Sequence, residues 1–308
     1  MIMPAPSFDQ LHVMLAVVEA GSFSGAARRL NRAQSAITYA VQRLEEQLGT
    51  PLFDRASYRP TLTLAGRTLL PRAQRIADEL LALCEQARGI TAGLEPELTL
   101  VVDAMFPMGT LLGALRNFSA EFPSVPPRIY VESLGAATDL VLNGTCALGL
   151  LLYFGSEFEP LQRRRLLEIT LIHVAAPNHP LGQYAGPVPR EELRRHVQLV
   201  VTDQSGLTGT RDHGVLSPQT WRLADLGAKH AMLTAGLGWG GMPLHLVAED
   251  LAAGRLRQIR FQPEPGDDDT VTLPLCTAYR RDRPPGPAGR WLLEHMAEAL
   301  ATSPEPMA

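Results

Sequence analysis

Residues 22–49 read SFSGAARRLNRAQSAITYAVQRLEEQLG and contain two helical patterns with only a few residues between them. The first pattern, residues 25–30, is too short to form a stable helix alone in water, so it must pack against a neighbour. Ala26 and Ala27 in this pattern permit two helices to cross closely. The second pattern, residues 34–48, places apolar residues at steps of four and three, which predicts one buried stripe. Together the two patterns predict a helix-turn-helix.

The outer face of the longer helix carries side chains that can form hydrogen bonds but bear no charge. Amide and hydroxyl groups on a helix can read base edges in the major groove of DNA. The alternative is an ordinary helical hairpin whose polar face is only solvated. The candidate DNA contacts on this helix are Gln34, Ser35, Thr38, Tyr39 and Gln42, with Arg43 beside them.

The segments on either side fit a winged helix-turn-helix. An apolar periodic pattern predicts a further helix at residues 8–20. After the helical pair, residues 49–66 are β-prone with a turn at residues 57–60, which predicts a hairpin, or wing. We expect Arg55 and Arg59 in the wing to contact phosphates, which position a domain on DNA without reading the sequence.

Charge is unevenly distributed along the chain. The net charge is −4 over 308 residues. Between Ser22 and Arg67, seven arginines against three acidic residues give +4, and the rest of the chain therefore carries −8. A basic segment on an acidic body predicts that the N-terminal segment has an anionic partner.

The motifs FSGAARRLNRAQSAITYAVQRLEEQLGTPLFDR and LTLAG resemble the winged helix-turn-helix of LysR-type transcriptional regulators. This resemblance implies a regulator that binds double-stranded promoter DNA. Three positions in the turn depart from the usual pattern: Arg32 replaces an apolar residue, Ala33 a capping serine and Ser35 a proline. The loss of a serine cap costs about 1 kcal/mol. Ser35 adds a donor and an acceptor near the bases, so base preference does not carry over from relatives.

A heptad pattern follows the winged domain at residues 67–93. Apolar residues alternate steps of four and three without interruption, which predicts a helix that pairs along its length with a second copy. The alternative is an amphipathic helix packed on its own domain. The seam consists of Leu69, Ala73, Ile76, Leu80, Leu83, Ala87 and Ile90. The resemblance also implies pairing of two subunits, and we expect a homotetramer made of two such dimers.

The remainder of the chain alternates β-prone and helical segments, which predicts a mainly parallel sheet flanked by helices. The segments NGTCALGLLL, APNHPLG and TAGLGWGGMPLHLVAEDLAAGRL resemble the effector-binding domain of the same regulators. This implies the two-lobed architecture of type 2 periplasmic binding proteins. The expected fold class is therefore α/β, with a winged helix-turn-helix at 1–66, a linker helix at 67–93 and an effector-binding domain at 94–308. Lobe I is expected at about 94–165 and 270–308, and lobe II at about 166–269.

A small organic effector is expected between the lobes, at the carboxyl ends of the strands. Many relatives have a Ser/Thr-rich first loop, but here Asp103 precedes Met and Phe, which predicts a more apolar pocket or a ligand with a donor. Two alternatives stay open: Met105 and Phe106 as core residues, and Trp239 as core filling. The candidate contacts are Ala104, Met105, Phe106, Ser133, Leu134, Asp203, Gln204 and Trp239.

No catalytic site, cofactor or metal is predicted. The eight histidines are scattered and the three cysteines lie far apart, so neither shows metal-ligand spacing. The glycines of residues 236–241 do not match a dinucleotide-binding loop. We therefore expect a protein that is not an enzyme.

Neither a signal peptide nor an apolar run long enough to span a membrane is visible, which predicts a cytoplasmic protein with no membrane partner. RNA polymerase is expected as a further partner of a promoter-bound regulator. The second class of function left open is a cytoplasmic solute-binding or transferase-like protein with the same two-lobed fold, in which the N-terminal region only mediates oligomerisation.

Overall fold

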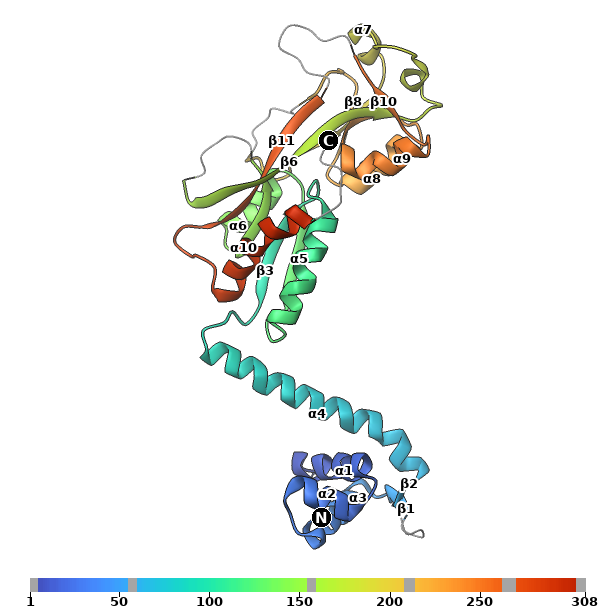
Figure 1. The fold of residues 1–308 in the computed structure, drawn as a ribbon. Coiled ribbons are helices and arrows are strands. Elements are labelled where there is room, and N and C mark those ends of the chain that lie inside the picture. The colour runs from blue at the N-terminus through green and yellow to red at the C-terminus, as the bar shows by residue number, and fades with distance from the viewer. Residues whose placement is uncertain (1–4, 55–59, 154–158, 208–213, 262–269, 303–308) are drawn as a thin grey trace. The chain divides into compact units, whose positions relative to one another are not determined.

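The computed structural model describes residues 5–54, 60–153, 159–207, 214–261 and 270–302. The chain divides into two compact units, Met1–Arg88 and Gly89–Ala308 (Figure 1).

Three helices form the core of the N-terminal unit: α1 (Phe8–Ala20), α2 (Phe23–Leu30) and α3 (Gln34–Leu48). Ser22 caps α2 by accepting the Gly25 N–H, and this helix therefore begins two residues before the predicted pattern. Asn31 ends α2 in the left-handed conformation, with φ of 51°. Asparagine tolerates this backbone geometry better than most residues do. The bounds of α1 and α3 are those predicted from the sequence.

The core of this unit contains the predicted stripe of α3. Ile37, Val41 and Leu44 are fully buried, and the small Ala26 of α2 is buried beside them. Leu48, the last residue of the predicted stripe, is instead 39 % exposed because it ends the helix. The short α2 is therefore stabilised by packing between its neighbours, as a two-turn helix requires.

A small hairpin and a long helix complete the winged domain. The strands β1 (Phe53–Asp54) and β2 (Thr61–Leu62) pair antiparallel. The helix α4 (Leu64–Thr91) begins three residues before the predicted linker, because the Thr63 hydroxyl accepts the Gly66 N–H and caps it. The α4 backbone approaches the start of the hairpin closely, since a Cβ atom at Gly66 would lie 2.2 Å from the Leu52 carbonyl oxygen.

The predicted seam of α4 has two different surroundings. Leu69 and Ala73 pack in the core of the N-terminal unit, which favours the alternative reading for this end of the helix. Farther along, Ile76, Leu83 and Ile90 are 51, 60 and 54 % exposed. Large apolar side chains that repeat at heptad spacing and face solvent are typical of a surface that pairs with another helix.

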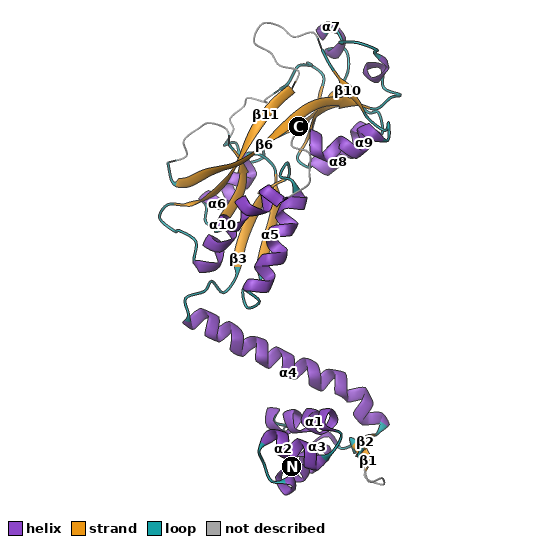
Figure 2. Cartoon of the chain, viewed as in Figure 1, coloured by secondary structure: helices purple, strands orange, loops and turns teal. Residues whose placement is uncertain are grey.

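One continuous sheet runs through the described part of the C-terminal unit, in the strand order β4-β3-β5-β11-β6-β9-β7-β8, with β10 paired to β6 (Figure 2). Its strands are β3 (Leu98–Asp103), β4 (Pro127–Glu132), β5 (Leu148–Leu152), β6 (Leu161–Ala175), β7 (Gln198–Val201), β8 (Thr220–Leu223), β9 (Trp239–Pro243), β10 (Arg257–Ile259) and β11 (Thr270–Arg280). The helices are α5 (Met108–Glu121), α6 (Gly135–Leu142), α7 (Arg190–Leu193), α8 (Leu226–Thr234), α9 (Leu244–Ala252) and α10 (Pro287–Thr302), with a 3₁₀ turn η1 at Pro180–Gln183.

The two halves of the sheet are parallel, as predicted, but their connection is not. In one half β3 pairs parallel with β4 and β5, and in the other β7 pairs parallel with β8 and β9. Between them β6 and β11 form a long antiparallel ribbon, from Leu161 opposite Arg280 to Ile172 opposite Thr270. The ribbon has a bulge at Leu166, where the predicted boundary between the lobes lies.

Alternate residues of the strands face different helices. Leu98, Leu100 and Val102 of β3 point into a core with α5 and α10, whereas Val101 packs with α6. This period of two is what a sheet covered on both faces requires. No helix in the described ranges is both long and apolar enough to cross a bilayer.

Candidate nucleic-acid interface and interlobe cleft

The structure brings the predicted base-reading side chains of α3 onto one accessible face. Tyr39 is 64 % exposed, which is unusual for a large aromatic side chain unless a partner covers it. Thr38 is partly buried and its hydroxyl donates to the Gln34 carbonyl at 3.0 Å. The Thr38 oxygen therefore remains an acceptor, with a methyl group beside it, rather than a free donor. The other exposed members of this face are Gln34, Ser35 and Gln42.

Arg43, the basic residue beside the polar face of α3, forms an ion pair within its own helix. Arg43 Nη1 lies 2.7 Å from Glu46 Oε2, and both side chains are about half exposed. An exposed ion pair of this kind is weak, so Arg43 can exchange Glu46 for a phosphate. The neighbouring Glu45 accepts the backbone N–H groups of Leu52 and Phe53 at 2.8 and 3.0 Å, and it thereby ties the start of the wing to α3.

The predicted wing contacts Arg55 and Arg59 lie outside the described residues.

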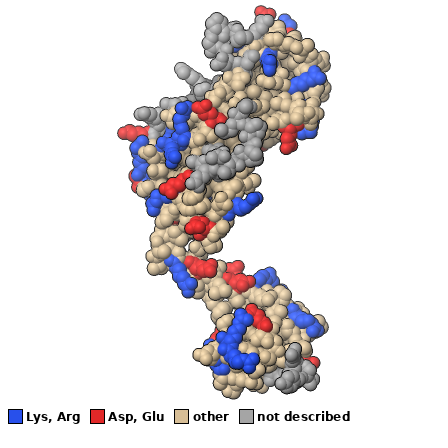
Figure 3. All heavy atoms as spheres, in the orientation of Figure 1, with Lys and Arg blue, Asp and Glu red and all other residues tan. Residues whose placement is uncertain are grey.

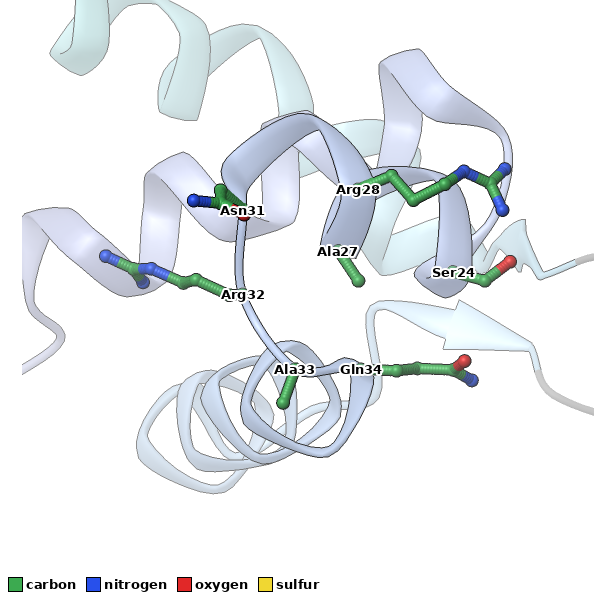
Figure 4. Close-up of a pocket in the computed structure, with 7 residues that line it drawn as sticks. All are labelled: Ser24, Ala27, Arg28, Asn31, Arg32, Ala33 and Gln34. Atoms are coloured by element: carbon green, nitrogen blue, oxygen red, sulfur yellow. The ribbon is translucent and has the colours of Figure 1, made fainter.

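A hollow of about 570 Å³ opens between α2 and the start of α3. Figure 4 shows Ser24, Arg28 and Gln34 extending toward one side of this hollow, while Arg32 extends toward the other. The floor contains Ala33, which gives α3 no side-chain cap, as the sequence predicted. The first turn of α3 therefore presents backbone N–H groups beside Arg28, and such groups attract anions.

The arginines around the turn are not equivalent. Arg32 forms a two-pronged ion pair with Asp9 of α1, at 2.8 and 2.9 Å, and this hydrogen bonding lowers the pKa of Asp9. Arg29 pairs with Glu19 at 2.7 Å. Arg28 makes no ion pair with any described residue. Figure 3 shows basic side chains on the visible face of the N-terminal unit with acidic ones among them. Among the arginines of α2 and the turn, Arg28 is thus the one that can contact a ligand without first breaking an ion pair to a described residue.

In the C-terminal unit, Asp103 joins two loops at the carboxyl ends of neighbouring strands. Its side chain is completely buried, and it accepts the N–H groups of Met105 and Leu134, each at 2.9 Å. Burial raises the pKa of Asp103 to about 7, although the two N–H donors act in the opposite direction. Leu134 has a positive φ of 59°, a strained geometry for leucine that Asp103 helps to hold.

The predicted effector contacts divide into accessible and buried residues. Phe106 is fully buried and Met105 is 7 % exposed, and both belong to the main core. Trp239 is also fully buried, and its indole N–H donates to the His196 carbonyl at 3.4 Å. These surroundings fit the core alternatives for all three residues. Ser133 is buried at 7 % exposure, whereas Ala104, Leu134, Asp203 and Gln204 are partly or fully exposed.

Loops from the two lobes meet at the predicted cleft. A Cβ atom at Gly135, which begins α6 after β4, would lie 2.4 Å from Asp203 Oδ2. Asp203 follows β7 in the other half of the sheet. The carboxyl ends of the parallel strands of both halves therefore face each other, which is where ligands bind in open α/β sheets.

Both parts of the chain match one protein family. Residues 8–67 match the bacterial regulatory helix-turn-helix protein, lysR family, and residues 91–301 match the LysR substrate binding domain. The chain belongs to the LysR family. The probable HTH-type transcriptional regulator YhaJ of Escherichia coli K12 is 30 % identical over 300 residues, 95 % of this chain and 96 % of the relative. The HTH-type transcriptional regulator PunR of the same strain is 27 % identical over 300 residues, 96 % of this chain and 94 % of that protein.

The fold of this LysR-family chain is also similar to a solved structure. The C206 mutant of Corynebacterium glutamicum OxyR matches with a TM-score of 0.52 at 21 % sequence identity, over 97 % of this chain and 94 % of that one. The family assignment makes the protein a ligand-responsive, DNA-binding transcriptional regulator. The predicted α/β fold, with an N-terminal helix-turn-helix and a two-lobed effector domain, is confirmed.

Two residues of this LysR-family regulator could not be singled out from the sequence. Arg28 was only counted as a charge, because the pairing of Arg29 and Arg32 with acidic residues of α1 is not visible in the sequence. Gly135 was not singled out either, since its closeness to Asp203 depends on two segments far apart in the chain. In the described ranges, no group of three or more His, Cys, Asp or Glu side chains is placed to hold a metal ion.

Proposed function

We propose that this regulator binds an interrupted palindromic site in double-stranded promoter DNA as a homo-oligomer, with α3 in the major groove. The exposed, uncharged face of α3 around Tyr39 carries this proposal, because its groups match the donors and acceptors of base edges. Gln34, Ser35, Thr38, Tyr39 and Gln42 would contact bases. Arg28, Arg43, Arg55 and Arg59 would contact phosphates.

A small organic effector would bind between the lobes, in contact with Ala104, Ser133, Leu134 and Gln204, and change their relative angle. In a homotetramer of two paired dimers, that change would alter the spacing of the DNA-binding domains and the bend of the DNA. An effector shifts this equilibrium only as far as its affinities for the two states differ. A regulator of this kind works at the chromosome in the cytoplasm, with RNA polymerase as a partner and without catalytic activity of its own.

The roles of Arg28 and Thr38 give different expected results in binding assays. Arg28→Ala should weaken binding to all DNA sequences alike and reduce the slope of log affinity against log salt by about one, because one phosphate contact is lost. Thr38→Ala should instead reduce discrimination at one base pair by about tenfold, which is within the range of one lost base contact. Mobility shifts on a set of promoter variants at two salt concentrations measure both effects.

Arg29→Ala is the matched control for Arg28, because Arg29 lies on the same helix but pairs with Glu19 and does not line the hollow. It should change the affinity and the salt slope less than Arg28→Ala does. Identical profiles for Arg28→Ala and Thr38→Ala across all sequences would contradict the assigned roles.

The exposed seam of α4 gives a second expected result. Leu83→Ser should weaken self-association at least tenfold, because it removes a buried side chain from the proposed helix pair. Leu81 provides a matched control, since it is 61 % exposed compared with 60 % for Leu83 but lies off the seam. Sedimentation velocity over a concentration series compares the two variants. Equal weakening by Leu81→Ser and Leu83→Ser would rule out the seam as the contact.

A further inference from the structure

The N-terminus of α6 in lobe I has no cap from its own segment. Leu134 occupies the capping position with φ of 59° and ψ of −131°, and its side chain provides no acceptor. Asp103 accepts the Leu134 N–H and so fixes this unusual backbone geometry. The first-turn N–H groups of a helix carry a partial positive charge, so an anion nearby stabilises them.

A carboxylate from lobe II lies against this helix end. Asp203 Oδ2 would be 2.4 Å from a Cβ atom at Gly135, and Ser205 Oγ would be at the same distance. Glycine at residue 135 therefore leaves room for both side chains, and a Cβ atom there would displace the ends of the Asp203 and Ser205 side chains.

The Asp203 side chain is held in place by its own loop. Asp203 Oδ1 accepts the Ser205 N–H at 2.9 Å, and the Ser205 hydroxyl lies 2.8 Å from Oδ1 and 2.9 Å from Oδ2. The Ser205 Oγ in turn accepts the Leu207 N–H at 3.0 Å. The carboxylate is thus oriented by lobe II before it meets lobe I, which limits the conformational entropy lost in the contact.

We propose that Asp203 is a positioning residue that sets the closure of the effector-free cleft, by placing its carboxylate against the positive N-terminal end of helix α6 across the gap between the lobes. The inference rests on the proposed function, in which the angle between the lobes is what the effector changes. In this arrangement the Asp203 loop and the start of α6 approach each other across the mouth of the cleft, and weakening that contact shifts the lobes toward a more open state. Asp203 then acts on the effector response through lobe geometry rather than by touching the effector.

Hydrogen exchange of the full-length, effector-free protein tests this proposal. Asp203→Ala should raise the exchange rates of amides 136–138 in the first turn of α6 up to about fivefold, the size expected for loss of a negative charge beside a helix N-terminus. Gly135→Ala should have the same effect from the other side of the cleft, because its Cβ atom displaces the Asp203 carboxylate. Asp203→Asn should give nearly the same increase, since its side chain carries no charge.

Asp225→Ala is the matched control. Asp225 caps α8 within lobe II by accepting the Ala228 N–H, so its loss should raise exchange in α8 and leave α6 unchanged. Tryptophan fluorescence measures the unfolding midpoint of the C-terminal unit and provides the second readout. Loss of a contact between the lobes should change α6 exchange without lowering this midpoint.

The proposal is overturned if Asp203→Ala leaves α6 exchange unchanged. It is also overturned if α6 exchange rises only together with a general loss of stability of this unit. Failure of the proposed function would be seen separately, as wild-type protein that does not bind promoter fragments, and would leave the exchange result standing.

Discussion

Replacement of Gly66 by alanine is expected to abolish promoter binding and to destabilise the N-terminal unit by about 3 kcal/mol, the upper end of the usual cost of overpacking. The added Cβ atom would lie 2.2 Å from the Leu52 carbonyl oxygen and 2.8 Å from a methyl carbon of Leu62. A side chain can rotate away from such a contact, but the Leu52 carbonyl belongs to the backbone at the start of the wing. Either the wing or α4 must therefore move.

Gly113→Ala is the control for the Gly66 prediction. Gly113 also lies within a helix, α5, but a Cβ atom there would have no neighbour within 4 Å. The change should be neutral or stabilise α5 by up to about 1 kcal/mol, the helix-propensity difference between glycine and alanine. Thermal unfolding followed by circular dichroism, together with mobility shifts, compares the two variants.

All three tryptophans, Trp221, Trp239 and Trp291, belong to the C-terminal unit. The fluorescence transition of Gly66→Ala should therefore match that of the wild type. Normal DNA affinity of Gly66→Ala would show that the close approach of α4 to Leu52 is not needed for the winged domain.

Replacement of Asp103 by alanine is expected to destabilise the C-terminal unit by about 3 kcal/mol, because it leaves two backbone N–H groups without acceptors. The same change releases the strained Leu134 and should reduce any effector response. Asp103→Asn should destabilise the C-terminal unit by an intermediate amount, since the amide oxygen can accept one N–H while the amide nitrogen faces the other donor. Glu132→Gln is the control, because Glu132 is opposite Asp103 on β4 but is exposed.

Asp103 should also make stability depend on pH. The pKa of Asp103 is about 7 in the folded protein, whereas its ordinary value is 3.8. Between about pH 4 and pH 7 the folded protein therefore binds this proton more tightly than the unfolded chain does. The contribution of this group to stability is therefore fully present below about pH 4 and is lost as pH rises through about 7. Denaturant unfolding at pH 5 and pH 8, followed by tryptophan fluorescence, should show this loss in the wild type. If the wild type and Asp103→Asn lost the same free energy of unfolding between pH 5 and pH 8, the assignment of this loss to Asp103 would be contradicted.

The sequence predicted the helices of the winged domain well because their ends are determined locally. Gly21, Asn31 and Gly49 each end a helix in the left-handed conformation, and the buried stripe of α3 follows from its spacing. The predicted start of α2 was two residues too late, because both Ser22 and Ser24 could act as the N-terminal cap. Only the structure shows that Ser22 accepts the Gly25 N–H.

The C-terminal unit was harder to predict because its pairings join distant segments. The parallel halves follow from alternating strands and helices, but β8 and β10 are short strands without a strong apolar pattern. The antiparallel ribbon of β6 and β11 joins residues about one hundred positions apart, so nothing in the local sequence reveals it. The burial of Trp239 was similarly undecided, since its neighbours come from β6 and from Phe261.

The β6–β11 ribbon restricts how genes for such proteins can diverge. Successive residues of a strand point to opposite faces, so an insertion or deletion of one residue in β6 beyond Leu166 would exchange the two faces of everything that follows in that strand. Ile169 and the fully buried Val174 would then change sides together with their neighbours. Length changes during evolution should therefore accumulate in the turns between strands, while the ribbon keeps a constant number of residues.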